Sequence, residues 1–136
     1  MHENRTANAV LSAVRSTLSK QGVSSVTVVG HSLGAALALL DGTFLKLQLD
    51  PTVSVRVVGY GMPRVGNQAF ANFIDSLLAG NVTHVNNQED PVPILPGRFL
   101  GFHHASGEIH IQDSGAWDNC PGESLCSCLC LCVGRC

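Results

Sequence analysis

The chain has 136 residues, of which 45% are apolar and 13% charged, a composition typical of one globular domain and not of a disordered protein. The formal net charge is −2, and neither a basic stripe nor an acidic run points to a nucleic-acid partner or a charged tail. No apolar run approaches the ~20 residues that span a membrane, and the polar first residues lack the apolar core of a signal peptide.

The first half of the chain predicts helix, strand, helix and strand. Apolar residues at spacings of three and four predict an amphipathic helix over residues 4–20. The β-branched run at 25–29 predicts a buried strand, and helix-forming residues continue from after Ser32 to about Leu49. Residues 53–60 predict the next strand. Strand, helix and strand at this spacing indicate a βαβ unit with parallel strands.

The second half predicts one more helix and three strands. A helix is expected over residues 68–78 and a third strand over 82–87. Residues 99–105 and 108–111 predict two short strands, which Ser106-Gly107 would join as a tight hairpin. The predicted fold class is α/β, with a mostly parallel central sheet, flanking helices and a C-terminal hairpin.

The pentapeptide G-H-S-L-G at residues 30–34 is the motif around which the chain is organised. It follows the predicted strand at 25–29 and precedes the helix-forming run that begins at residue 35. Strand, G-x-S-x-G and helix is the context that a nucleophile elbow requires. The sequence therefore predicts a catalytic serine here, the alternative being a purely structural Gly-Ser-Gly turn.

Each position of this motif has a physical reason. The turn must be sharp, so a side chain at Gly30 or Gly34 is expected to collide with the adjoining strand or helix. Ser32 would then project its hydroxyl from a strained tip at the positive end of the helix. The N–H of Leu33 would point into the same space and could hold an oxyanion.

A serine hydroxyl needs a base to activate it and a carboxylate to orient that base. In this kind of arrangement the acid follows the serine, on a loop at the carboxyl end of a later strand. Asp90 fits this role because it follows the predicted strand at 82–87 in a loop stiffened by prolines. Glu89 is the neighbouring competitor, while Asp113 and Asp118 are less well placed. A solvated loop carboxylate is an equal interpretation of Asp90 from the residues alone.

The histidine of such a triad is the weakest part of the prediction. His103 and His104 are adjacent in a predicted strand and so face opposite sides, and His110 lies within the next strand. None lies on a long loop that could reach over the serine, so a structural role is expected for each. His31 precedes both serine and acid and is interpreted as a packing or supporting residue, and His84 shows no pattern.

Four stretches in this order resemble the fungal class 3 lipases, a branch of the α/β-hydrolases. The resemblance covers about residues 3–122, and the ordered set is far more specific than the elbow alone. The four stretches are 28–38 (V-V-G-H-S-L-G-A-A-L-A), 61–67 (G-M-P-R-V-G-N), 90–96 (D-P-V-P-I-L-P) and 101–105 (G-F-H-H-A).

The resemblance implies an esterase that acts on acylglycerols or related esters at a lipid–water interface. It implies Ser32 as the nucleophile, Asp90 as the acid and the Leu33 N–H as one oxyanion donor. His104 matches a family histidine that is not the catalytic base. No metal and no organic cofactor are implied, and members of the family are usually secreted.

The chain also departs from the family pattern. Family members have a longer N-terminal part, with a signal peptide, first strands, a lid helix and a second oxyanion donor. Their catalytic histidine lies well beyond residues 101–105. On this basis we expect a truncated lipase-like domain at 1–122 that lacks the triad histidine. Loss of that histidine in a serine hydrolase costs on the order of 10⁶ in kcat.

The C-terminal segment at 123–136 differs from everything before it. Residues 118–123 predict a loop, and all six cysteines lie from Cys120 onward, so no disulfide framework is expected in the body of the chain. Alternate cysteines at 126–132 could bind a soft metal, but structural zinc sites use C-x-x-C pairs. The segment is therefore interpreted as an aberrant tail.

Two functions follow from these observations. The first is a serine ester hydrolase that forms an acyl-enzyme on Ser32, with an ester lipid as substrate. The alternative is a catalytically inactive lipase fragment that keeps the framework without the triad histidine.

Overall fold

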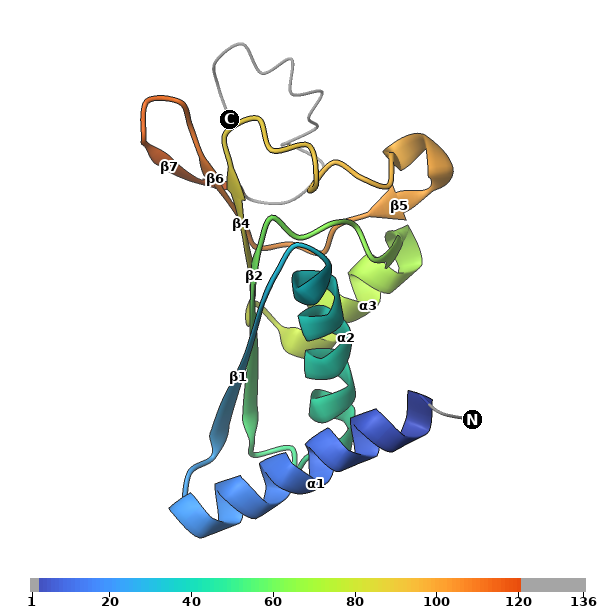
Figure 1. Cartoon of the computed structure of the whole chain (residues 1–136), viewed down its shortest axis with the longest axis vertical. Coiled ribbons are helices and arrows are strands. Elements are labelled where there is room, and N and C mark those ends of the chain that lie inside the picture. The colour runs from blue at the N-terminus through green and yellow to red at the C-terminus, as the bar shows by residue number, and fades with distance from the viewer. Residues whose placement is uncertain (1–2, 121–136) are drawn as a thin grey trace.

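A computed structural model describes residues 3–120, and both His2 and the cysteine-rich segment at 123–136 lie outside these residues. Two of the three helices lie along one side of a central sheet, and the first helix lies across the lower end of the sheet in this view (Figure 1). The order of elements is α1 (Glu3–Gln21), β1 (Ser25–His31), α2 (Leu33–Gln48), β2 (Ser54–Tyr60), β3 (Gly66–Asn67), α3 (Gln68–Leu78), β4 (Val82–Asn87), the 3-10 turn η1 (Arg98–Leu100), β5 (Phe102–His103), β6 (Glu108–Ile111) and β7 (Trp117–Cys120).

The central sheet has the strand order β1-β2-β4-β6-β7. The first four strands are parallel, and β7 returns antiparallel to β6. β1 pairs with β2 along its whole length and, among residues 3–120, has β2 as its one neighbouring strand. The predicted parallel βαβ unit is confirmed, because α2 connects these two paired strands.

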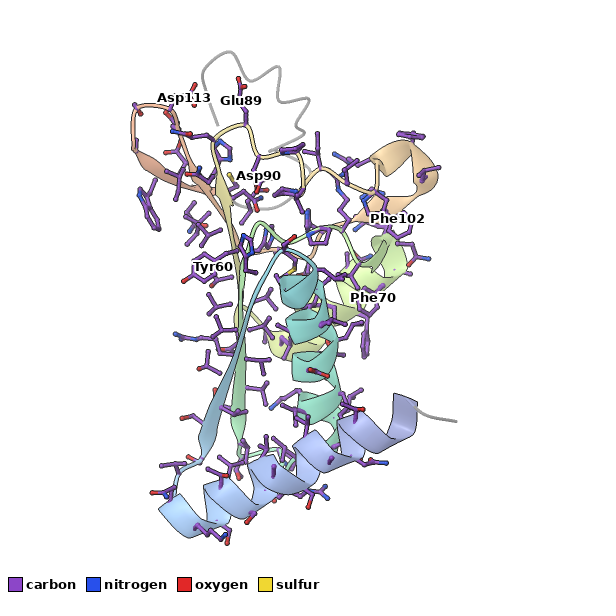
Figure 2. All side chains as sticks on the ribbon, in the orientation of Figure 1. Tyr60, Phe70, Glu89, Asp90, Phe102 and Asp113 are labelled. Carbon is purple, nitrogen blue, oxygen red and sulfur yellow. The ribbon has the colours of Figure 1, made fainter. Side chains whose placement is uncertain are left out.

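The helices cover one face of this sheet and leave the other open. In β2 the alternate residues Val55 and Val57 are buried against the helices. On the opposite face Val29 is 59% exposed and Tyr60 is 46% exposed, and Figure 2 shows Tyr60 directed away from the helices. No helix within residues 3–120 combines the length and hydropathy needed to cross a bilayer. Buried and exposed side chains alternate along these strands because successive residues of a strand point to opposite faces of the sheet.

Helix α2 lies close to the sheet because glycines remove side chains at the contact. A Cβ on Gly42 would lie 2.3 Å from Val57 Cγ2, and a Cβ on Gly59 would lie 3.1 Å from the Cβ of Ala35. Real Cβ atoms essentially never show the first of these distances, and the second is tighter than nine in ten real Cβ contacts. Gly42 therefore maintains the helix–sheet spacing at the cost of some intrinsic helix stability.

The predicted hairpin between residues 99–105 and 108–111 is wrong. β5 pairs instead with β3, and β6 forms the C-terminal hairpin with β7. Both the N–H and the hydroxyl of Ser106 donate to the carboxylate of Asp75 on α3, at 2.8 and 2.9 Å. A Cβ on Gly107 would lie 2.1 Å from the carbonyl oxygen of Val82. Residues 106–107 therefore approach the start of β4 closely and do not form a hairpin turn.

The buried side chain of Arg64 holds the loop that follows β4. Its guanidinium donates to the carbonyl oxygens of Ile94 and of Pro96, the latter at 3.1 Å, and its main-chain N–H donates to Leu95 at 2.8 Å. Three bonds from one residue fix residues 94–96 against the loop after β2. This loop also carries Asp90, so Arg64 contributes to the rigidity of the predicted site.

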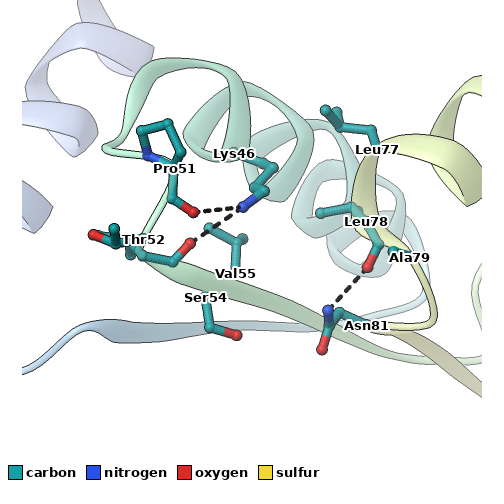
Figure 3. A pocket seen from close by; sticks show the side chains of 10 residues that line it. Lys46, Pro51, Thr52, Ser54, Val55, Leu77, Leu78, Ala79 and Asn81 are labelled. Atoms are coloured by element: carbon teal, nitrogen blue, oxygen red, sulfur yellow. Dashed lines mark hydrogen bonds between the residues drawn. The ribbon is translucent and has the colours of Figure 1, made fainter.

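A pocket lies at the amino ends of the strands, between the start of β2 and the end of α3 (Figure 3). Lys46 donates there to the carbonyl oxygens of Pro51 and Val53, at 3.5 and 3.3 Å, and Asn81 donates to Leu78 at 2.9 Å. These polar side chains of the pocket therefore hydrogen-bond to main-chain carbonyl oxygens of the surrounding turns. Ligand sites of parallel sheets form at the carboxyl ends of the strands, so the functional site is expected at the other end of this sheet.

Replacing Gly42 by alanine should lower the free energy of unfolding by about 1–3 kcal/mol, because the stiff, fully buried Val57 cannot move aside. Gly34 is a matched control in the same helix, since its Cβ would meet nothing within 4 Å. Gly34→Ala should leave stability unchanged or raise it by up to about 1 kcal/mol. Urea unfolding of both variants checks this. Equal stability losses would contradict the close-packing explanation.

Replacing Arg64 by methionine should lower the free energy of unfolding by about 2 kcal/mol, because two loop carbonyls lose a charged donor. It should also increase proteolytic cleavage within residues 91–101. Arg98→Met is the control, since Arg98 is an exposed arginine of the same loop. Equal cleavage in both variants would contradict the role of Arg64 as a clamp.

Candidate active site

Ser32 is the single residue between β1 and α2, and its backbone is strained. Its φ of 54° and ψ of −127° lie in a region that residues other than glycine rarely adopt. The turn is held from both sides, because the Ser32 N–H donates to Tyr60 O at 2.8 Å and the Ser32 carbonyl accepts from Ala35 N at 2.9 Å. The G-x-S-x-G pentapeptide therefore forms the sharp strand-to-helix turn expected of it.

The two glycines of the pentapeptide are not equivalent. A Cβ on Gly30 would lie 2.1 Å from the carbonyl oxygen of Gly34, so any side chain there would push the helix away. A Cβ on Gly34 would meet nothing within 4 Å among the described residues. The expected collision at Gly34 is therefore wrong, because that position faces away from the sheet. Gly30 alone enforces the close turn.

The backbone at the start of α2 supplies hydrogen-bond donors beside the serine. Leu33 is the first residue of α2, so its N–H has no acceptor one turn earlier in the helix. The helix dipole places partial positive charge at the same point. A negatively charged oxygen formed next to Ser32 would be stabilised there.

Asp90 lies beyond the carboxyl end of β4, at the end of the sheet where Ser32 is found. Its N–H donates to Asn87 O at 3.0 Å, and its Oδ1 accepts from Val92 N at 2.9 Å. These bonds fix the carboxylate within its own loop. Figure 2 shows Glu89 further out along the loop and Asp90 nearer the strand ends, and Glu89 is the more exposed residue.

Gly61 separates the carboxylate of Asp90 from the ring of His31. Its ideal Cβ position lies 2.9 Å from Asp90 Oδ2 and 4.0 Å from His31 Nε2. Gly61 has a φ of +55° and donates its N–H to Val85 O at 2.8 Å. A side chain at this position would displace the carboxylate, so the glycine is part of the geometry of the site. His31 borders the candidate site, and its supporting role stays a prediction.

Two histidines form a buried, stacked pair. The rings of His84 and His104 stack with their centroids 4.6 Å apart. His104 Nε2 lies 2.8 Å from Pro93 O, and His84 Nε2 lies 3.0 Å from Ala105 O. These contacts give His104 the structural role that was expected of it.

Sequence reasoning missed His84, Arg64 and Gly61. His84 is 1% exposed in β4, but Val82, Val85 and Asn86 are buried as well, so no alternation along this strand marks it. Arg64 lies in the stretch 61–67 that carries the family resemblance, but its role could not be inferred, since its partners are main-chain carbonyls 30 and 32 residues away.

The site consists of main-chain donors and carboxylate or hydroxyl oxygens. Within residues 3–120 no three histidine, cysteine, aspartate or glutamate side chains are grouped as metal ligands. The predicted cysteine-rich tail lies outside the described residues. The described site therefore offers chemistry based on a serine hydroxyl, an amide donor and a carboxylate.

Sequence comparison identifies relatives for most of the chain. Residues 2–100 match the family described as lipase (class 3). The secreted mono- and diacylglycerol lipase LIP4 of Malassezia restricta is 43% identical over 100 residues, and the secreted mono- and diacylglycerol lipase MDL2 of Malassezia globosa is 40% identical over 102 residues. The matches cover 72% and 74% of this chain, which spans about a third (33%) of the length of each relative.

Solved structures agree with the sequence matches. Lipase II from Rhizopus niveus superposes with a TM-score of 0.77 at 30% identity, over 88% of this chain and 47% of that one. A triacylglycerol lipase described as having a serine protease triad as its catalytic centre superposes with a TM-score of 0.71 at 35% identity, over 78% of this chain and 40% of that one. The predicted α/β-hydrolase architecture is confirmed, and the chain belongs to the class 3 lipase family.

Proposed function

We propose that this chain carries the nucleophile and the acid of a serine ester hydrolase that acts on acylglycerols. The observation that carries the proposal is the strained conformation of Ser32 next to the N-terminal amide of α2. A strained residue supported by surrounding structure is typical of functional sites. The relatives described as mono- and diacylglycerol or triacylglycerol lipases support the substrate class.

In the proposed reaction, Ser32 Oγ attacks the carbonyl carbon of the ester. The electron pair of the carbonyl moves to its oxygen, which accepts a hydrogen bond from the Leu33 N–H. The proton of the serine passes to an imidazole and then to the departing alcohol oxygen. Collapse of the tetrahedral species breaks the ester C–O bond and leaves an acyl-enzyme, which water hydrolyses to release the fatty acid.

Asp90 would orient and stabilise the imidazole in this scheme. Its Oδ1 is occupied by Val92 N, while its Oδ2 is directed toward Gly61 and the space between the loops. A carboxylate in this position acts by holding the ring in one orientation and stabilising its positive charge.

One observation favours the alternative of an inert framework. The buried histidines His84 and His104 are hydrogen-bonded to main-chain carbonyl oxygens, which is a structural role. If no imidazole reaches Ser32, the chain would form the turn at Ser32 but would not hydrolyse esters. The two alternatives differ in the reactivity of the serine, which can be measured directly.

A fluorophosphonate should modify the intact chain at one site per molecule, and Ser32→Ala should abolish the modification. The strained turn and the adjacent amide favour attack of the hydroxyl on a tetrahedral centre. Mass spectrometry of the whole protein measures the label, and Ser19→Ala is the control because Ser19 is an exposed serine on α1. A folded chain that takes up no label would contradict the hydrolase proposal and leave the inert framework.

Replacing Asp90 by asparagine should lower the rate of labelling and of ester hydrolysis, by up to about 10⁴-fold as measured for a triad acid elsewhere. An asparagine Oδ1 can still accept from Val92 N, so the turn is expected to persist. Glu89→Gln should leave both rates unchanged. A loss of rate in the Glu89 variant but not in the Asp90 variant would transfer the role to Glu89.

A further inference from the structure

A second hollow lies on the sheet, apart from the candidate active site. It has a volume of about 380 Å³, within the range of about 300–1,000 Å³ that is common for ligand pockets. Three strands and the adjoining turns line it, through Gly80, Val82, Thr83, Gly107, Ile109, Trp117 and Asn119. Ser32 follows β1, which lies at the opposite end of the strand order from β7, so the two sites are separate.

The strand register brings the side chains of this hollow to the open face of the sheet. Thr83 follows Val82, which packs into the core, and so Thr83 faces the side without helices. Ile109 is paired with Asn119 across the hairpin of β6 and β7, and Trp117 lies two residues before Asn119 on the same face of β7. In Figure 1 this hairpin extends away from the helices. The hollow is therefore built by regular strands, whose side chains have fixed directions.

Trp117 provides a broad apolar wall for the hollow. It is the one tryptophan of the chain, and it is 63% exposed. Tryptophan offers a flat ring face of large area, and exposed tryptophans are enriched at binding surfaces. The wall can therefore stack against the apolar face of a ring-shaped ligand.

Two neutral polar side chains complete the hollow. The Thr83 hydroxyl and the Asn119 amide are hydrogen-bonded to no other side chain or main-chain group within residues 3–120. Each of these groups can both donate and accept a hydrogen bond. The hydroxyl group of a ligand also donates and accepts, so these two side chains suit a ligand that carries hydroxyl groups.

The lining contains no charged side chain, which narrows the class of ligand. Phosphate and carboxylate ligands are ordinarily held by charged donors, and none is present in this lining. An acyl chain would displace water from Thr83 and Asn119 without replacing its hydrogen bonds, which is unfavourable. A neutral ring with apolar faces and hydroxyl groups around its rim fits both the tryptophan wall and the polar side chains.

We propose that this hollow binds a neutral hexopyranose ring, stacked on Trp117 and hydrogen-bonded by Thr83 and Asn119. The C–H groups on the face of such a ring contact the indole, while its hydroxyl groups reach the two polar side chains. A free saccharide and the headgroup of a glycolipid share this ring. The inference does not depend on the proposed function, because binding at this hollow requires no ester hydrolysis.

The fluorescence of Trp117 in the intact chain tests the proposal. At least one of methyl glucoside, methyl galactoside and methyl mannoside should change its emission in a saturable way. Thr83→Val and Asn119→Leu should each raise the dissociation constant by about three- to tenfold, because one neutral hydrogen bond is lost with little change of shape. Leu47→Ser, which alters an exposed leucine on α2 outside the hollow, should leave it unchanged.

Two outcomes of this titration would overturn the proposal. One is the lack of any saturable change with all three glycosides at concentrations up to about 100 mM, a limit far weaker than specific recognition. The other is an equal dissociation constant in all variants. Trp117→Ala should abolish binding of the same glycoside in equilibrium dialysis, with circular dichroism showing that the variant is folded. Undiminished binding by that variant would contradict stacking.

A set of alkyl compounds distinguishes the possible sources of the ring. Equal affinity for the methyl and hexyl forms of the bound glycoside would support a free saccharide as the ligand, and tighter binding of the hexyl form would support a glycolipid headgroup. Hexanol has the alkyl chain without the ring and should leave the emission of Trp117 unchanged. If hexanol binds as tightly as the glycosides, the hollow is an apolar pocket and the proposal is wrong.

Discussion

The one-residue turn at Ser32 is the constraint on which the rest of the structure depends. To leave β1 and enter α2 within a single residue, the chain must adopt a positive φ and bring Gly34 O against Gly30. The helix then runs back along the strands it has just left, and Gly42 allows it to lie close to them. The exposed amide at the start of α2 and the orientation of the serine are both consequences of that path.

Much of the fold could be predicted from the sequence because its local signals agree. The extent of α3 and β4 followed from apolar periodicity and from the bounding Gly80, and these elements lie where expected. The path of residues 99–120 could not be predicted, because it depends on the long-range hydrogen bond that Ser106 donates to Asp75 and on the close approach of Gly107 to β4. β7 was missed because aspartate and asparagine at its centre disfavour strands.

The site was predictable to a different extent. Ser32 and Asp90 could be proposed as site residues because a tight turn and a proline-stiffened loop leave local traces in the sequence. Their roles remain a prediction, while their common position at the carboxyl ends of β1 and β4 is observed. Arg64 and the pairing of His84 with His104 depend on contacts between distant segments, which a single sequence does not reveal.

The place of β1 in the sheet has a consequence for Ser32. This strand is hydrogen-bonded to β2 alone among the described residues, so separating it breaks one ladder instead of two. The bond from Ser32 N to Tyr60 O is the last rung of that ladder, and local opening of the rung would relax the strained dihedral angles. Slow exchange of the amide hydrogens of β1 and a properly formed turn at Ser32 therefore report on the same local opening equilibrium.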